Sequence, residues 1–286
     1  MRWTPAFAGE LLMPSLPPIE KDVEARAEAK PPRGAFDAPG EGPHDAARKD
    51  YLLRLGDDAL VLGQRLSEWC GHAPALEVDL SLANLALDLV GQATLLLAEA
   101  GDADQLAFHR DVLDFRNCLL VEQPNGDFAR TIARHFLYST WQHMLLERMA
   151  GSPDAFLAGF AAKAVKEITY HRELASEWTV RLGDGTDESA RRMAEGLDWC
   201  WRFIPELFEV DETLEALIAA GVAPDPRAFE SDYRAALAAV LADAKLAVPA
   251  DQRPILGGRR GHHSEHLGHL LAVMQYVPRT YPDSVW

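Results

Sequence analysis

From residue 49 onward, apolar residues recur at the three- and four-residue spacing of amphipathic α-helices. The segment 76–100 differs because it is apolar almost all round, and this pattern predicts a helix that is buried on most sides. Ala and Leu are abundant while Val, Ile and Thr are sparse, which favours helices over strands. The first amphipathic stripe consists of Leu52, Leu55, Ala59, Leu62, Leu66 and Trp69 and ends at residues 71–74.

Turn signals divide the following sequence into helices and connections. Residues 101–126 form a long connection that ends in a Pro-Asn-Gly turn. Asp127 is then placed to cap a helix that runs to about residue 150. After a short break, Ser152 caps the next helix, which reaches about residue 182. Further helices are predicted at residues 186–209, 227–245 and 263–280.

The lengths of these connections predict the topology. The joins between the first four long helices are short, long and short. This order connects two antiparallel hairpins through one crossover, which is the ferritin-like arrangement. We therefore predict an all-α fold, a ferritin-like four-helix bundle with additional C-terminal helices. An irregular all-α domain is the alternative.

The N-terminal segment has a different composition from the rest of the chain. Residues 1–48 contain eight of the 18 prolines and show no sustained apolar period. Such a segment cannot bury enough apolar surface to offset the entropy lost on ordering. We predict a disordered extension at residues 1–48 and a ferritin-like helical domain at residues 49–286.

Composition excludes several classes of function. The formal net charge of −16 argues against a nucleic-acid partner, because phosphate binding needs clustered Lys and Arg. The three cysteines are scattered, as in cytosolic proteins with reduced thiols. No run approaches the roughly 18 apolar residues of a membrane span, and no secretory signal is evident. We expect a cytoplasmic protein without a membrane partner.

The apolar segment 76–100 is interrupted by Ser81, Asn84, Asp88 and Gln92. Their spacing of three and four residues stacks them on one face of a helix. An unpaired polar group costs about 1–3 kcal/mol when it is buried. A helix buried on most sides therefore requires polar partners across the bundle.

Suitable partners occur on the third and fourth predicted helices. Thr131, His135, Ser139 and Gln142 are spaced similarly along the third helix. The fourth carries Lys163, Glu167 and His171, of which the first two can pair at i,i+4. Antiparallel register also places Asp58 level with Asp88, and Glu167 beside His135.

Ferritin-like dinuclear sites use a Glu from each of two helices and Glu-x-x-His from each of the other two. The only such motif here, Glu41 to His44, lies in the segment predicted to be disordered. Asp88 is followed by Gly91 where the His would stand, and His171 is preceded by Ile168 where the Glu would stand. The third helix has no acidic residue between positions 128 and 146.

A hard dinuclear site needs several carboxylates at once. We therefore predict that this chain binds no metal and that hydrogen bonds and an ion pair fill a vestigial site. A mononuclear site made by Asp58, Asp88, Glu167 and His171 is one alternative, and an unrelated buried network is another. The predicted vestigial site comprises Asp58, Asn84, Asp88, Gln92, His135, Lys163, Glu167 and His171.

Two motifs stand near the C-terminus. His262, His266 and His269 have helical spacing that suits a metal, although a polar helix N-terminus is the simpler interpretation. Residues 257–261, Gly-Gly-Arg-Arg-Gly, have donors for a phosphate but lack the P-loop Lys-Ser/Thr pair. A flexible solvated loop is the favoured interpretation of this second motif.

Five sequence blocks resemble the C-type members of the phenylacetyl-CoA epoxidases, also called phenylacetate-CoA oxygenases. The resemblance runs in order from about residue 51 to residue 286. The blocks are YLLRLGDD at 51–58, GQRLSEWCGHAP at 63–74, LLVEQPNGDFA at 119–129, KEITYH at 166–171 and HSEHLG at 263–268.

This resemblance implies a ferritin-like, structural subunit that is not catalytic and holds no cofactor itself. Its partner would be a homologous catalytic subunit with a di-iron centre, which epoxidises the ring of phenylacetyl-CoA with O₂. An NADPH-dependent reductase subunit would supply the electrons. The family pattern often has a carboxylate near Ser139, and its absence here weakens the case for a metal further.

Two segments are candidate contacts with such a partner. One is the loop at residues 122–128 and the other is the C-terminal His-Ser-Glu-His segment. A self-sufficient di-iron oxygenase or oxidase and a general helical interaction module remain alternatives. The candidate interface residues are Glu122, Asn125, Asp127, His263, Glu265 and His266.

Overall fold

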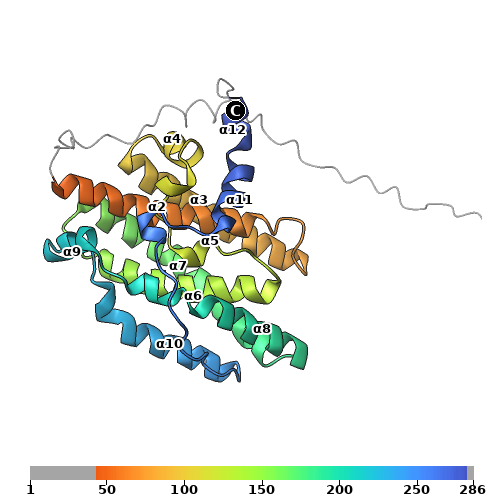
Figure 1. Ribbon diagram of the computed structural model, residues 1–286. Helices are drawn as coiled ribbons and strands as arrows, with labels where there is room; N and C mark the ends of the chain where they lie inside the picture. Colours follow the sequence, from red (N-terminus) through yellow and green to blue (C-terminus); the bar gives the residue numbers. More distant parts are fainter. Residues whose placement is uncertain (1–42, 282–286) are drawn as a thin grey trace, which may run out of the picture. The chain divides into compact units, whose positions relative to one another are not determined.

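The computed structural model describes residues 43–281, and within this range every regular element is a helix. Helices α2 (Pro43–Ser67) and α3 (Leu76–Ala100) form one antiparallel hairpin. Helices α6 (Phe128–Met149) and α7 (Ala155–Gly183) form a second one (Figure 1). The predicted all-α fold class is confirmed.

The connections between these helices have the predicted order of lengths. Residues 68–75 and 150–154 join the helices within each hairpin, and residues 101–127 cross from one hairpin to the other. Two hairpins joined by one long crossover form a ferritin-like bundle. The crossover contains α4 (Ala103–Phe108), the 3₁₀ helix η1 (Val112–Asp114) and α5 (Leu119–Glu122).

The C-terminal third adds shorter helices around the bundle, as predicted. Helix α8 packs against both α6 and α7, and so does α10. The predicted helix at 263–280 is divided at Gln275, whose side-chain amide donates to the carbonyls of Ala107 and Arg110 on the crossover. These elements are α8 (Asp187–Trp201), η2 (Ile204–Phe208), α9 (Glu212–Ala219), η3 (Pro226–Phe229), α10 (Glu230–Asp243), η4 (Gly258–Arg260), α11 (Glu265–Met274) and α12 (Tyr276–Thr280).

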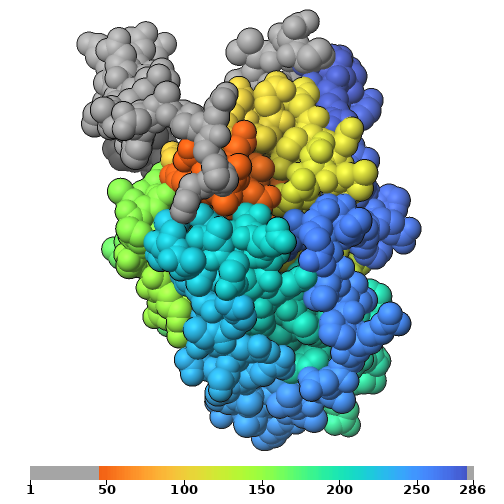
Figure 2. Space-filling view, turned by 60° about the vertical axis from the view of Figure 1, so that its left-hand side comes forward, coloured from red at the N-terminus to blue at the C-terminus, as the bar shows by residue number. Residues whose placement is uncertain are grey.

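Residues 244–281, which we call the C-terminal segment, return to the first hairpin and to the crossover that follows it. Figure 1 shows the chain running from the end of α10 past α6 to α11. In Figure 2 this segment (blue) lies beside the crossover (yellow) and the α9–α10 region (cyan to light blue). The ion pair between Arg279 and Asp111, 3.1 Å long, joins the last helix to the crossover.

The start of the first helix differs from its prediction. Helix α2 begins at Pro43, six residues before the predicted boundary at residue 49. Proline is favoured in the first helical turn because its missing N–H would have no partner there. Arg48 then ties this end to both hairpins, with 2.8 Å to Glu99 and 2.5 Å to Asp154. The predicted disorder of residues 1–42, and Glu41 with it, falls outside the described residues.

Helix α3 has the predicted bounds, but the expectation that it is buried on most sides is wrong. One side packs against α2, and contacts with α7 are sparse. The opposite side exposes four leucines, among them Leu76 at 72% and Leu87 at 69%. We call this surface the α3 face, formed by Leu76, Leu80, Leu87 and Leu95.

The absence of a membrane-length apolar run also needs correction. Among the described residues, α3 is long and apolar enough to span a membrane by length and composition alone. Of its most apolar stretch, 44% of the residues are buried inside the bundle. Core helices of soluble proteins meet the same criterion, so this property does not distinguish a lipid partner from a protein partner.

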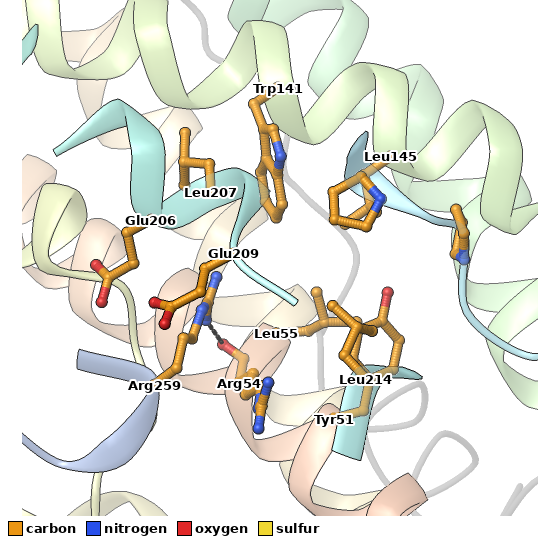
Figure 3. Close-up of a pocket in the computed structure, with 12 residues that line it drawn as sticks. Tyr51, Arg54, Leu55, Trp141, Leu145, Glu206, Leu207, Glu209, Leu214 and Arg259 are labelled. Atoms are coloured by element: carbon orange, nitrogen blue, oxygen red, sulfur yellow. Dashed lines mark hydrogen bonds between the residues drawn. The ribbon is translucent and has the colours of Figure 1, made fainter. Parts of the chain in front are cut away.

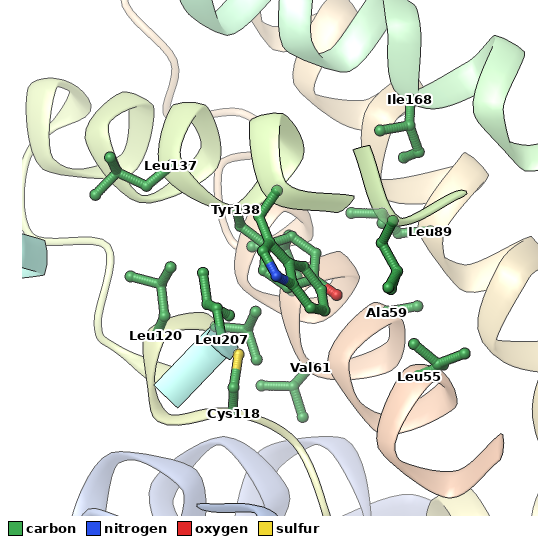
Figure 4. Close-up of a cluster of buried hydrophobic side chains, with 14 of the residues drawn as sticks. Leu55, Ala59, Val61, Leu89, Cys118, Leu120, Leu137, Tyr138, Ile168 and Leu207 are labelled. Carbon is green, nitrogen blue, oxygen red and sulfur yellow. The ribbon is translucent and has the colours of Figure 1, made fainter. Parts of the chain in front are cut away.

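The bundle centre is mostly apolar (Figure 4). Leu55 and Ala59 of α2 lie with Leu89 of α3, Leu137 of α6 and Ile168 of α7 among the buried residues. Burial of one leucine or isoleucine side chain is worth about 1.5–3 kcal/mol. The four long helices are therefore held together chiefly by a shared apolar core.

Candidate functional site

Six of the eight residues predicted for the vestigial site come together between three helices. We call this group, with Gln142, the polar layer. Its members are Asp88 and Gln92 on α3, His135 and Gln142 on α6, and Lys163, Glu167 and His171 on α7.

Hydrogen bonds and ion pairs connect most of the polar layer. The His171 Nε2 atom lies 3.3 Å from an oxygen of Asp88. Gln92 donates to Glu167 at 2.9 Å and accepts from Gln142 at 3.2 Å. The Lys163 ammonium lies 3.8 Å from Glu167, so the predicted i,i+4 pair is confirmed. Of the four polar residues on α3, Asp88 and Gln92 thus have partners on α6 and α7, whereas Ser81 bonds the carbonyl of Glu77 on its own helix.

His135 is the exception in the polar layer. Its ring centroid lies 5.2 Å from that of His171, but neither of its nitrogens has a hydrogen-bond partner among the described residues. Burial, followed by the nearby His171 and Arg134, lowers the pKa of His135 well below its usual value. The ring is therefore neutral at physiological pH.

The polar layer does not fit a dinuclear iron site. Nowhere in residues 43–281 do three or more His, Cys, Asp or Glu side chains gather in an arrangement that would hold a metal. The Glu167 carboxylate already bonds Gln92 and Lys163, and Asp88 is 39% exposed at the edge of the layer. Two irons require several inward carboxylates, and α2 and α6 contribute none to this layer.

Two of the eight predicted residues lie elsewhere. Asn84 is exposed beside the α3 face instead of buried. Asp58 does not face Asp88. The predicted register is wrong, because Gly56 approaches Leu96 and Leu97 on α3, which places Asp58 level with about residue 94. Neighbouring helical positions also point about 100° apart. Ala59, one residue further along, is the one that joins the buried apolar cluster (Figure 4).

Asp58 instead belongs to a buried ionic cluster that the sequence analysis missed. The Arg259 guanidinium, drawn in Figure 3, donates to both Asp58 oxygens, at 3.0 and 2.8 Å. The Cys118 N–H and the Tyr138 hydroxyl also donate to this carboxylate, at 2.7 and 3.1 Å. Side-chain exposure is 0% for Asp58 and 11% for Arg259.

Asp57, the preceding residue, makes a second buried ion pair. It accepts from Arg110 and from the Arg116 N–H, the latter at 2.8 Å. Burial raises the pKa of Asp57, although Arg110 counteracts the shift. Because Asp57 binds the crossover and Asp58 binds the C-terminal segment, one turn of α2 anchors both.

Two further buried carboxylates hold loops of the chain. Glu206 accepts from the N–H groups of Leu119, Gly257 and Gly258 at 2.6–2.8 Å. Burial raises the pKa of Glu206. Glu122 accepts from the Ser264 N–H at 2.7 Å, and its other oxygen lies 2.7 Å from His263.

The loop at residues 257–261 is therefore not the flexible solvated loop that was predicted. Gly258 is buried, and a Cβ there would collide with the carbonyl oxygen of Asn117. Gly261 has φ +79°, a conformation that favours glycine. Arg259 of this loop binds Asp58 and is not available to a phosphate.

The candidate interface residues also need correction. Glu122 and His263 have 0% side-chain exposure and bind each other, so neither side chain is exposed for contact with a partner. The 122–128 loop and the C-terminal His-Ser-Glu-His segment face one another within the chain. Burial lowers the pKa of His263, but its bond to Glu122 outweighs this and raises the pKa overall.

The other four interface candidates are less buried. Asn125 donates to the carbonyl of Arg65. Asp127 caps α6, as predicted, and lies 3.6 Å from Arg192. The carbonyl of His266 accepts from Arg65, whereas Glu265 is exposed.

The sequence contained a pattern that could have indicated the buried ion pairs of Asp57 and Asp58. Two adjacent aspartates, Asp57 and Asp58, interrupt the apolar stripe of the first helix. Only one of them can occupy a given helix face, so the pair indicates two separate partners. Nothing in local sequence identifies those partners, because Arg110 and Arg259 lie 53 and 201 residues away.

The fold and the polar layer together define a ferritin-like helical protein in which linked polar side chains lie between α3, α6 and α7 beside an apolar core. A model of the family described as phenylacetic acid catabolic protein matches residues 38–286. The chain belongs to this family of phenylacetate catabolism, and the resemblance of its sequence blocks is confirmed.

Similarity to a curated relative extends over most of both chains. The chain is 49% identical over 242 residues to the C component of the 1,2-phenylacetyl-CoA epoxidase of Escherichia coli (strain K12). This match covers 82% of the chain and 98% of the relative. The relative is named as one subunit of an epoxidase, which implies partner subunits.

Proposed function

We propose that this chain is the non-catalytic structural subunit of a cytoplasmic, multicomponent monooxygenase that epoxidises the ring of phenylacetyl-CoA. It binds and supports a homologous ferritin-like subunit, which carries the di-iron centre and performs catalysis. An NADPH-dependent reductase subunit supplies electrons to that centre. The match to the C component of an epoxidase supports this assignment.

The chemistry of the polar layer supports a role without catalysis. Activation of O₂ by a metal requires open coordination positions and ligands free to bind. Here Glu167, Gln92 and Asp88 bond other side chains of the layer. The α2 helix directs its two central carboxylates away from the layer, toward Arg110 and Arg259.

The single observation that carries the partner role is the α3 face. Leu80 and Leu87 are 57% and 69% exposed and stand two helical turns apart on one side of α3. Exposed apolar patches on a folded protein mark interaction sites. A related ferritin-like subunit presents long helices of the same kind, so its apolar ridge is the occupant that we infer.

A groove beside the α3 face gives such a ridge a place to pack. It lies between α3 and α7, with a volume of about 160 Å³. Gly91 lies between Leu87 and Leu95 on α3, and Phe160 lines the groove from α7. Helices pack by inserting the ridges of one into the grooves of another. Lys163 and Glu167 also line the groove and offer polar contacts to a partner.

A binding experiment tests this proposal directly. Leu80→Asp and Leu87→Asp are combined, and affinity for the homologous di-iron subunit is measured by titration. Two leucines worth about 1.5–3 kcal/mol each predict at least about a 100-fold loss of affinity. Because both side chains are exposed, the free energy of unfolding of the isolated chain should change little.

Leu113→Asp is the matched control, since Leu113 is 71% exposed but lies on the crossover. It should leave affinity for the di-iron subunit unchanged. Full binding by the α3 variant would disprove the α3 face as the docking surface. A stable monomer with no affinity for the di-iron subunit would refute the partner role itself.

A further inference from the structure

A second pocket lies apart from the α3 face and shares no lining residue with the groove beside it. It is formed by the C-terminal end of α8, residues 255–256 and the start of α11, with a volume of about 320 Å³. This volume falls within the range of small-molecule sites. Trp199, Phe203 and Leu256 make an aromatic and aliphatic wall.

The charge of this pocket is opposite to that of the chain. The protein has 44 acidic and 28 basic residues. Its lining nevertheless includes Arg202, His262 and His266 and contains no Asp or Glu. Two buried carboxylates accept from backbone N–H groups of lining residues, Glu206 from Leu119 and Glu122 from Ser264, but neither lines the pocket. The pocket therefore favours an anion.

Arg202 supplies the main positive charge. In the part of the chain that the structure describes, its guanidinium makes no ion pair, and its Nε atom is buried without a hydrogen-bond acceptor. It lies over the Trp199 ring, 5.6 Å from the centroid. A buried donor without an acceptor is costly, so a ligand oxygen would improve this site.

Two other lining residues also lack acceptors for their donors. The Trp199 indole N–H and the Ser264 hydroxyl are buried without partners among the described residues. Ser264 precedes α11 but makes no side-chain cap, so the positive end of that helix adds to the field. These unmet donors belong to lining residues of one pocket and lie next to an apolar wall.

We propose that this pocket binds a small aromatic carboxylate. The ring would lie against Trp199, Phe203 and Leu256, and the carboxylate would pair with Arg202. A planar guanidinium binds a carboxylate through two parallel hydrogen bonds. A nucleotide phosphate also offers anionic oxygens, but the apolar wall favours the aromatic acid. This site is independent of the proposed epoxidase role.

Equilibrium dialysis of the full chain tests the proposal, with phenylacetate as the probe. Phenylacetamide, inorganic phosphate and coenzyme A serve as comparison ligands. We expect saturable binding of phenylacetate and at least about tenfold weaker binding of the neutral amide, because the amide loses the charged pair. Phosphate and coenzyme A should bind more weakly than phenylacetate.

Substitutions locate the site. Arg202→Gln should weaken phenylacetate binding at least about tenfold. Leu256→Glu places a carboxylate in the wall at a residue that is 42% exposed, so it should weaken binding without unfolding the chain. Arg253→Gln, an exposed arginine three residues before Leu256, is the control and should bind normally.

Three results would overturn the proposal. The first is the absence of saturable phenylacetate binding in the millimolar range. The second is phenylacetate binding that Arg202→Gln and Leu256→Glu both leave unchanged. The third is binding of phosphate or coenzyme A in preference to phenylacetate, which would exclude an aromatic carboxylate as the ligand.

Discussion

At the scale of single residues, the buried carboxylates of this protein act as anchors between distant segments. Asp57, Asp58, Glu122 and Glu206 each accept hydrogen bonds from parts of the chain far away in sequence. Removing one partner of a buried ion pair leaves an uncompensated charge. These four carboxylates therefore contribute to the stability of the crossover and the C-terminal segment.

The pair between Asp58 and Arg259 gives the clearest stability test. Arg259→Met should lower the free energy of unfolding by about 3–5 kcal/mol, because Asp58 is left buried without its ion-pair partner. Denaturant unfolding measures the change. Arg191→Met, which removes exposed pairs with Glu188 and Glu195, is the control and should leave the free energy of unfolding nearly unchanged. Equal effects of the two substitutions would contradict the anchoring role.

His135 predicts how stability depends on pH. Its pKa is lowered in the folded protein, so below pH about 6.5 the unfolded chain binds a proton that the folded chain does not. The free energy of unfolding should therefore fall as the pH falls, and His135 contributes up to about 1.4 kcal/mol per pH unit to this loss.

Leucine at this position removes that dependence. His135→Leu should gain stability relative to the parent chain as pH falls below about 6.5, as measured by thermal or denaturant unfolding across pH. His269→Leu changes an exposed histidine and serves as the control. Parallel stability curves for the parent and His135→Leu would show that His135 is protonated in the folded chain.

At the scale of elements, the C-terminal segment closes the fold through Gly258. A Cβ there would collide with the carbonyl oxygen of Asn117. Gly258→Ala should therefore cost about 1–3 kcal/mol and make the C-terminal segment more sensitive to limited proteolysis. In contrast, a Cβ at Gly159 on α7 would meet no atom within 4 Å. Gly159→Ala should therefore raise the free energy of unfolding by at most about 1 kcal/mol. A proteolysis pattern unchanged by Gly258→Ala would contradict this closure.

Sequence periodicity was sufficient for the four long helices and the connections between them, but it did not predict α9. The predicted segment 76–100 coincides with α3, and the Asp127 cap of α6 was correct. The predicted Ser152 cap was wrong, because Asp154 caps α7. Periodicity could not show what covers an apolar helix. Leu80 and Leu87 follow the same pattern as core leucines although they are exposed, because a face for a partner and a face for the core have the same composition.

The candidate site was only partly predictable for a similar physical reason. Spacing along one helix correctly paired Lys163 with Glu167, since such pairs depend on local geometry alone. The direction of Asp58 depends on how α2 is rotated in the bundle, and its partner Arg259 comes from a loop with no helical period. The pairing of Glu122 with His263 likewise joins the end of α5 to a loop 141 residues away.

At the scale of the whole molecule, the structure has two surface sites, and the polar layer opens into the first of them through Asp88 and Lys163. The α3 face and its groove offer an apolar site for a second protein, while the Arg202 pocket offers a cationic one for a small anion. Between them, the polar layer and the ionic cluster satisfy most of their polar groups internally. This organisation fits a supporting subunit better than a self-sufficient oxygenase.

The most direct test of that account is iron analysis of the two ferritin-like subunits after separation from an active complex. The account predicts that the iron stays with the homologous subunit and that this chain retains far less than one iron per copy. Two tightly held irons in this chain would contradict it and would make the polar layer a working oxygen-activating centre.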